Sequence, residues 1–348
     1  VLGEGELLVA ARATLVLPNE ERHLLRLTER FGAAPLTTLR LRFPVGEGAF
    51  TSSSRGWWYT VAGNHQPNRW GIAFVEWGAE NEVRTAFVGL PLGVETIWLP
   101  LAAPAPQGVS VAQTAARDGV VLSYVTPGGV KNSWTVPRPL EVRPRQWSAQ
   151  LLPDGTIAVV AIEGTPDAPA RVVLHLLDPH GASAREEIVL AESLDAWDLN
   201  SAVEADGALA VVVRNASGIR GAIVDPHLQT AVHWRLLSES GESVSYPRVI
   251  SAEPNFVVAW TSSRAGALQL RARTLKRKSA DLAPTTIATV ASRSGKTPFF
   301  TAISDEDELL FFWQSDGLVT RRLPSDLGGY ALLAAIHECF CAAPRQQP

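Results

Sequence analysis

Methionine is absent from all 348 residues of the chain, position 1 included. A chain that lacks an initial Met begins after processing or trimming, and removal of a secretory signal is one explanation. A trimmed tag or an omitted leader would leave the same start. We therefore expect an exported protein, in the periplasm, on the cell surface or secreted, rather than a cytoplasmic one.

Cysteine is almost absent, because only Cys339 and Cys341 occur. Two thiols exclude a disulfide scaffold, and they neither require nor exclude an oxidising compartment. Together with His337 they supply three soft metal ligands at most, short of a tetrahedral zinc site. The acidic run at 305–308 lacks the Gly and the alternating spacing of a Ca²⁺ loop, and it predicts an exposed hairpin turn. We therefore expect no metal.

Long apolar runs and a strong charge imbalance are also missing. No stretch approaches 18 uninterrupted apolar residues, so no transmembrane segment is predicted. The net charge of -4 gives no electrostatic reason to expect nucleic acid or an anionic membrane as partner. The basic run at 276–278 is short and indicates a solvated turn. Neither a phosphate-binding glycine loop nor a Gly-x-Ser-x-Gly elbow occurs, and no cofactor is predicted.

What the sequence does contain is a repeat. A polar turn, an apolar strand that ends in an aromatic residue, a short break and an arginine-rich strand recur along the chain. The ends of the six apolar runs lie at Trp77, Tyr124, Ile162, Arg214, Trp260 and Trp313. Their spacing averages about 47 residues, which is typical of a propeller array of short strands.

Each repeat divides into about four strands. Asp-Gly at 118–119, 154–155 and 206–207 separates two β-rich runs and predicts a hairpin turn, because Gly tolerates positive φ. The apolar run after the turn suits a strand that is buried on both faces. A third strand carries Arg271 and Arg273 on one face. A fourth, outermost strand is predicted at 96–101, 231–237, 285–290 and 330–337.

The repeat resembles those of the β-propeller superfamily, particularly bacterial propellers related to sialidases and other carbohydrate-active enzymes. The resemblance covers most of the chain but rests on period and strand pattern. The sialidase Asp box, the Gly-His with Trp-Asp pair and the paired Gly-Gly of kelch repeats do not recur. The resemblance therefore implies a fold and no activity.

We predict an all-β fold, a single β-propeller of four-stranded antiparallel blades over residues 1–342. Seven blades fit if residues 1–55 form a degenerate first blade, and six blades with an N-terminal extension are the alternative. A flexible tail is predicted at 343–348.

The candidate binding residues lie near the start of the strand before each apolar run. In a propeller this first strand lines the central channel, so aromatic side chains there would form a partial ring edged by polar groups. Such a rim suits a sugar or peptide through stacking and hydrogen bonds, and packing between sheets is the alternative role. The rim residues are Trp57, Trp58, Trp147, Gln150, Trp197, Asp198, Asn200, Tyr246, Arg248 and Phe299.

Two functions remain open from the sequence. The first is a non-catalytic scaffold that binds a protein or glycan partner through this rim, as a module or as a subunit of an assembly. The second is a glycan-acting hydrolase or lyase at the channel mouth, which would need paired carboxylates beside the rim. Asp198 with Glu76 or Glu163 is such a pair, and solvated or turn-capping carboxylates are the alternative. No catalytic residue is assigned.

Overall fold

The structure is a computed structural model of the whole chain. The backbone is described for residues 6–16, 19–28, 33–41, 45–52, 56–66, 69–78, 83–90, 101–105, 109–116, 119–137, 143–164, 170–180, 184–192, 194, 196–227, 232–264, 267–277, 284–290, 300–305, 308–314, 318–324 and 327. Side chains are described for part of these, from residue 71 onward. Phe299, the tail at 343–348, His337 and both cysteines lie outside the described residues.

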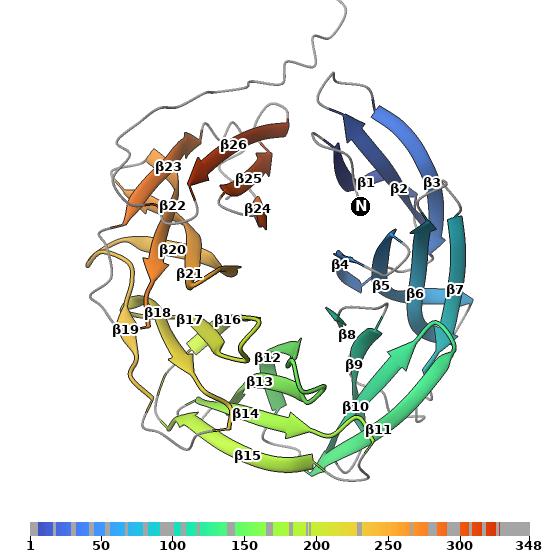
Figure 1. Cartoon of the computed structure of the whole chain (residues 1–348), viewed down its shortest axis with the longest axis horizontal. Helices are drawn as coiled ribbons and strands as arrows, with labels where there is room; N and C mark the ends of the chain where they lie inside the picture. Colours follow the sequence, from blue (N-terminus) through green and yellow to red (C-terminus); the bar gives the residue numbers. More distant parts are fainter. Residues whose placement is uncertain are drawn as a thin grey trace, which may run out of the picture.

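The described chain is all β, with 26 strands in seven antiparallel sheets that follow one another around a ring (Figure 1). The first three sheets contain β1 (Glu6–Val16), β2 (Asn19–Thr28) and β3 (Ala33–Leu41); β4 (Val45–Ser52), β5 (Gly56–Gln66), β6 (Arg69–Gly78) and β7 (Val83–Gly89); and β8 (Leu101–Ala105), β9 (Val109–Ala116), β10 (Gly119–Thr126) and β11 (Gly129–Pro137).

The other four sheets continue around the ring. They contain β12 (Arg143–Leu151), β13 (Ile157–Gly164), β14 (Arg171–Leu177) and β15 (Ala184–Ala191); β16 (Ala196–Val203), β17 (Leu209–Asn215), β18 (Gly218–Val224) and β19 (Arg235–Leu236); β20 (Ser243–Ala252), β21 (Asn255–Arg264), β22 (Ala267–Leu275) and β23 (Thr285–Val290); and β24 (Phe300–Asp305), β25 (Glu308–Gln314) and β26 (Leu318–Pro324).

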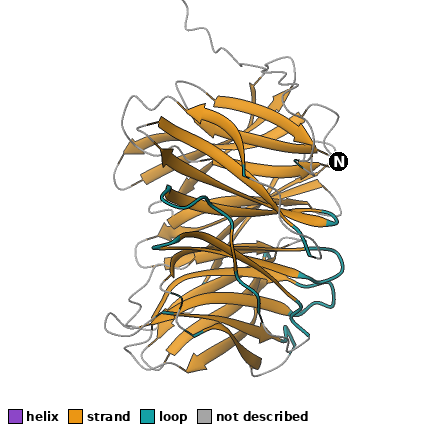
Figure 2. Cartoon of the chain, turned by 90° about the vertical axis from the view of Figure 1, so that its left-hand side faces the viewer, coloured by secondary structure: helices purple, strands orange, loops and turns teal. Residues whose placement is uncertain are grey.

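The first strand of each sheet lies nearest the centre of the ring. From the second sheet on, β4, β8, β12, β16, β20 and β24 each contact the next in this order (Figure 1). Seen from the side, the sheets stack around the ring with their strands crossing its thickness (Figure 2). Residues at the beginning of an innermost strand therefore lie at one end of the central channel.

The core consists of apolar layers between consecutive sheets. One layer joins Val160 of β13 to Leu199 of β16, and another joins Val212 of β17 to Val258 of β21. The second strands of these sheets are buried on both faces, as the continuous apolar runs predict; Leu209 to Val213 are all fully buried. Trp260, at the end of such a run, is fully buried too.

The hairpin predictions are confirmed where the structure describes them. Turns occupy residues 153–154 and 205–206, and Gly155 and Gly207, which follow them, have positive φ. Asp305 pairs with Glu308, so the acidic run does close a hairpin. The predicted outer strand at 285–290 is β23.

The strand order differs from the prediction in the second and third sheets. There the apolar run is the third strand, β6 or β10, because β4 and β8 add a strand on the channel side. Trp57 and Trp58 therefore lie on β5, the second strand, and not on the innermost strand as predicted. β4, which the prediction grouped with the first blade, pairs with β5. Residue 101 begins β8 instead of ending an outer strand.

No helix long and apolar enough to cross a membrane is present in the part of the chain that the structure describes.

Candidate functional site

Trp197 is the most exposed of the predicted rim side chains that the structure describes. Its relative exposure is 38%, and the guanidinium carbon of Arg214 lies 5.3 Å from the centre of its indole ring. Nε of Arg214 lies 2.6 Å from Oδ2 of Asp198. A guanidinium over an indole face is attracted by the ring quadrupole, and the carboxylate balances its charge.

A β-bulge places these three groups together. Asp198 on β16 lies opposite Arg214 on β17, but the register shifts between Ala196 and Asp198, so Trp197 has no cross-strand partner. The extra residue bends the strand and re-aims its side chain. Arg214 is held further by the next sheet, because Nη1 donates to the Val244 carbonyl at 3.0 Å and to Ser245 Oγ at 3.1 Å.

Two predicted polar rim residues join neighbouring sheets. Gln150 Nε2 on β12 donates to the Ser201 carbonyl on β16 at 2.7 Å. Asn200 Oδ1 on β16 accepts from the Val249 amide on β20 at 2.8 Å. Ser201 Oγ also donates to Ser148 Oγ at 2.7 Å. These side chains satisfy polar groups between inner strands.

The other predicted aromatic residues are in packed positions where they are described. Trp147 packs against the apolar layer between the third and fourth sheets, and its buried Nε1 has no hydrogen-bond partner in the described structure. Tyr246 packs against the layer between the last two sheets and has a φ of 53°. Arg248 on β20 is half-buried. The side chains of Trp57 and Trp58 lie outside those described.

Glu163 on β13 is a fully buried carboxylate in an ionic cluster within the fourth sheet. Its Oε1 lies 3.0 Å from Nε2 of His175, and its Oε2 accepts from Arg171 Nη2 at 3.1 Å. Arg171 Nη2 also reaches Glu187 Oε1 at 3.1 Å. Glu163 lies four residues after Val159 on β13, so the two side chains are on the same face of the strand. Val159 packs toward the third sheet. Asp198 instead pairs with Arg214, which reaches the sixth sheet, so the two carboxylates do not converge.

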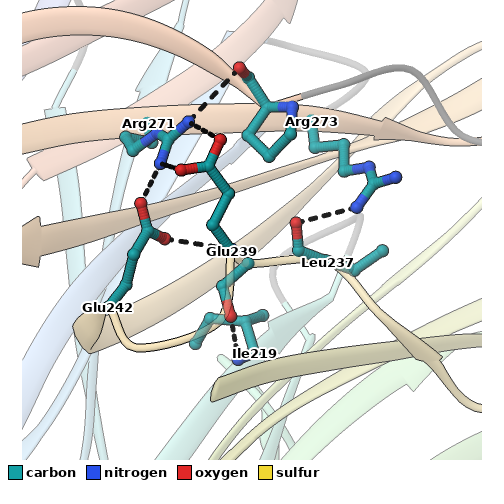
Figure 3. Close-up of polar contacts among 8 residues, drawn as sticks. Ile219, Leu237, Glu239, Glu242, Arg271 and Arg273 are labelled. Carbon is teal, nitrogen blue, oxygen red and sulfur yellow. Dashed lines mark hydrogen bonds and ion pairs between the residues drawn. The ribbon is translucent and has the colours of Figure 1, made fainter. Parts of the chain in front are cut away.

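A second ionic cluster joins the fifth and sixth sheets (Figure 3). The side chain of Arg271 on β22 is 6% exposed and forms ion pairs with Glu239 and Glu242. Nη1 and Nη2 each lie 3.1 Å from an oxygen of Glu239. Arg273 Nη1 donates to the Leu237 carbonyl at 2.9 Å. Arg271 and Arg273 therefore do share a face, as the strand period predicts.

A third cluster closes the opposite end of the same two sheets. Arg277 pairs with Glu204 and Asp206, and the Ala205 amide donates to Glu253 Oε1 at 3.1 Å. The hydrogen bond from Arg277 lowers the pKa of Asp206 to about 2, and burial raises the pKa of Glu204. Both carboxylates, Asp206 first, hold the pKa of Arg277 above its usual range.

Among the side chains that the structure describes, no group of three or more His, Cys, Asp or Glu residues could hold a metal ion. Arg214 is the site residue that sequence reasoning missed. Its signal was its position, because it ends an apolar run where Trp260 or Trp313 stands in other repeats. Because Arg214 is a cation at a position that is aromatic in other repeats, a neighbouring group that pairs with its charge was to be expected.

The sequence matches no family model and no curated protein. Its structure does resemble solved ones. A puromycin-hydrolyzing peptidase of Mycobacterium tuberculosis matches with a TM-score of 0.55 at 10% identity, over 95% of this chain and 53% of that one. The hydrazine synthase of Kuenenia stuttgartiensis matches with 0.54 at 13%, over 80% and 76%. The polysaccharide lyase Uly1 matches with 0.52 at 9%, over 94% and 89%.

These structural matches are to β-propeller proteins. The fold is a β-propeller. At such low identities the likeness concerns the fold alone, and the chain spans about half of the peptidase. The activities of these proteins differ, and a propeller fold supports many unrelated functions.

Proposed function

We propose that this protein is a non-catalytic β-propeller that binds a protein or glycan partner at the channel-side surface formed by Trp197, Asp198 and Arg214. The exposed indole of Trp197 carries the proposal. A large aromatic ring held rigidly at a protein surface offers apolar contact area at little entropic cost, and such residues dominate binding interfaces. Seven sheets in the ring support a seven-bladed propeller.

The ion pairs of Asp198 and Glu163 support binding rather than catalysis. Hydrolysis of a glycosidic bond needs two carboxyl groups that flank the bond. Asp198 is paired with Arg214, and Glu163 is fully buried beside His175. Neither carboxylate faces the other across an open surface.

The test is binding of the wild type and of Trp197→Ala to a glycan array and to protein extract from the native source. Trp197→Ala should weaken capture of the bound partner at least about tenfold, which corresponds to about 1.4 kcal/mol. The melting temperature should stay close to that of the wild type, because the ring is partly exposed. Trp147→Phe, which keeps a ring in the packed position, is the matched control and should bind like the wild type.

Two results would overturn the proposal. Unchanged capture by Trp197→Ala would place the contact elsewhere. Depolymerisation of an array glycan by the wild type would identify an enzyme instead of a scaffold.

A further inference from the structure

We propose that the buried Arg271 is a positioning residue for the Trp197 surface. It fixes the connection between β19 and β20, and the start of β20, directly after this connection, presents two groups that help to hold Arg214 over the indole of Trp197. The consequence for binding rests on the function proposed above, whereas the geometry can be tested without any ligand.

The first step is the burial of Arg271. A buried guanidinium is strongly unfavourable unless it is paired and hydrogen-bonded. Arg271 is paired with both Glu239 and Glu242, and the side chain of Glu242 is itself 1% exposed (Figure 3). Nη2 also donates to the Pro284 carbonyl at 3.4 Å. Both carboxylates belong to the connection, so the buried charge ties this segment to β22.

The second step is the connection itself, residues 237–242. At its beginning the Leu237 amide donates to the Ile219 carbonyl at 2.8 Å, and the Ile219 amide donates to Ser238 Oγ at 3.0 Å. Gly241, with a φ of 79°, allows the tight turn. The Glu239 amide donates back to Glu242 Oε2 at 3.2 Å. The segment is therefore anchored to β18 at one end and to Arg271 at the other.

The third step leads from the connection to the indole. Glu242 directly precedes β20, and the next residues supply the Val244 carbonyl and Ser245 Oγ that accept hydrogen bonds from Arg214. Hydrogen bonds from N–H to O in proteins usually have donor–acceptor distances of about 2.7–3.2 Å, and the two bonds from Arg214 to β20 lie near the upper end of this range. A small shift of the start of β20 would remove these two contacts and leave Arg214 with its Asp198 ion pair, so the guanidinium would cover the face of Trp197 less firmly.

Arg277 provides a matched control. It also joins the fifth and sixth sheets through two carboxylates, but Glu204 and Asp206 precede β17 whereas Arg214 lies near its end. The five residue steps of strand from Leu209 to Arg214 span about 17 Å. Loss of Arg277 should therefore loosen the same pair of sheets without moving Arg214.

The experiment is hydroxyl-radical footprinting, with the oxidation rate of Trp197 measured by peptide mass spectrometry on variants that circular dichroism shows to be folded. Arg214→Ala sets the scale and should raise the rate about twofold, because the ring loses its stacked guanidinium. Arg271→Met, which keeps an unbranched side chain, should raise it nearly as much. Glu239→Gln should give a smaller rise, and Arg277→Met none.

Glu239→Gln carries the test if Arg271→Met does not fold, because the side chain of Glu239 is 41% exposed. Wild-type rates in every folded variant of Arg271 and Glu239 would overturn the proposal. An unchanged rate in Arg214→Ala would also overturn it, because Arg214 would then not cover the ring. Failure of the proposed function would give a different result. Trp197→Ala would then capture the partner as the wild type does, while the Arg214, Arg271 and Glu239 variants would still show the expected changes in the oxidation rate.

Discussion

Glu163 and Arg271 are buried charged side chains that form ion pairs. Glu163 has no exposed surface, and His175 and Arg171 both contact its carboxylate. The same guanidinium contacts Glu187, whose side chain is 43% exposed, at the same distance of 3.1 Å. Two carboxylates thus share one arginine and differ mainly in burial, which allows the contribution of burial to be measured within one cluster.

Glu163→Gln should lower the free energy of unfolding by about 1–3 kcal/mol, because it replaces the buried carboxylate that contacts Arg171 and His175 with a neutral amide. Glu187→Gln, the matched control, should change it by less than about 0.5 kcal/mol, as is usual for a surface pair. Urea unfolding followed by tryptophan fluorescence measures both values. Equal effects of the two substitutions would show that Glu163 is not a buried ionic partner in solution.

At the scale of the strand, the sequence predicted what local chemistry determines. Continuous apolar runs identified β17 and β21 as buried strands, and Asp-Gly identified the turns that precede β13 and β17. The side chains that face a neighbouring sheet were less predictable. The two-residue period gives the face of a strand but not the sheet that packs on it, and the bulge at Trp197 changes the parity locally.

The same reason explains what the sequence did not show at the rim. Asn200 and Gln150 bond to inner strands of adjacent sheets, and their contact with a ligand stays a prediction. Trp57 and Trp58 were placed one strand too far inward, because β4 does not repeat the apolar pattern that marks the other strands. These contacts depend on how neighbouring sheets pack against each other, and that packing is determined by residues that lie far apart in the sequence.

The turn before β17 should give two opposite pH effects. The folded-state pKa of Asp206 is lowered from 3.8 to about 2, so its stabilising contribution is present above about pH 4 and is lost as the pH falls toward 2. The folded-state pKa of Glu204 is raised above 4.5, so its contribution is present below pH 4.5 and is lost as the pH rises through the folded value.

Urea unfolding of variants separates the two carboxylates. The stability of the wild type relative to Asp206→Asn should decrease as the pH falls from about 4 to about 2. The stability relative to Glu204→Gln should decrease as the pH rises above 4.5. If the difference in stability between the wild type and Glu204→Gln did not vary with pH, burial would not raise the pKa of the Glu204 carboxyl group.

At the scale of the molecule, the apolar layers lie between sheets rather than within one. The layer between the fifth and sixth sheets contains Val212 of β17 and Leu275 of β22, and Gly221 of β18 lets Leu275 approach: a Cβ there would lie 3.3 Å from Leu275 Cδ2. If the side chains of one sheet left this layer, the apolar side chains of the other sheet would be exposed to water. Adjacent sheets should therefore unfold as one cooperative unit, although no pairing between their described strands joins them.

Leu275→Ala tests this cooperativity through amide hydrogen exchange measured by mass spectrometry. Removal of a fully buried leucine side chain costs about 2–5 kcal/mol. Exchange should therefore accelerate in β21 and β22, and also in β17 and β18 of the neighbouring sheet. Thr289→Ala, on the exposed face of the outermost strand β23, should leave β17 at the wild-type rate. Acceleration confined to β20–β23 would mean that each sheet opens alone and that the shared layer does not couple them.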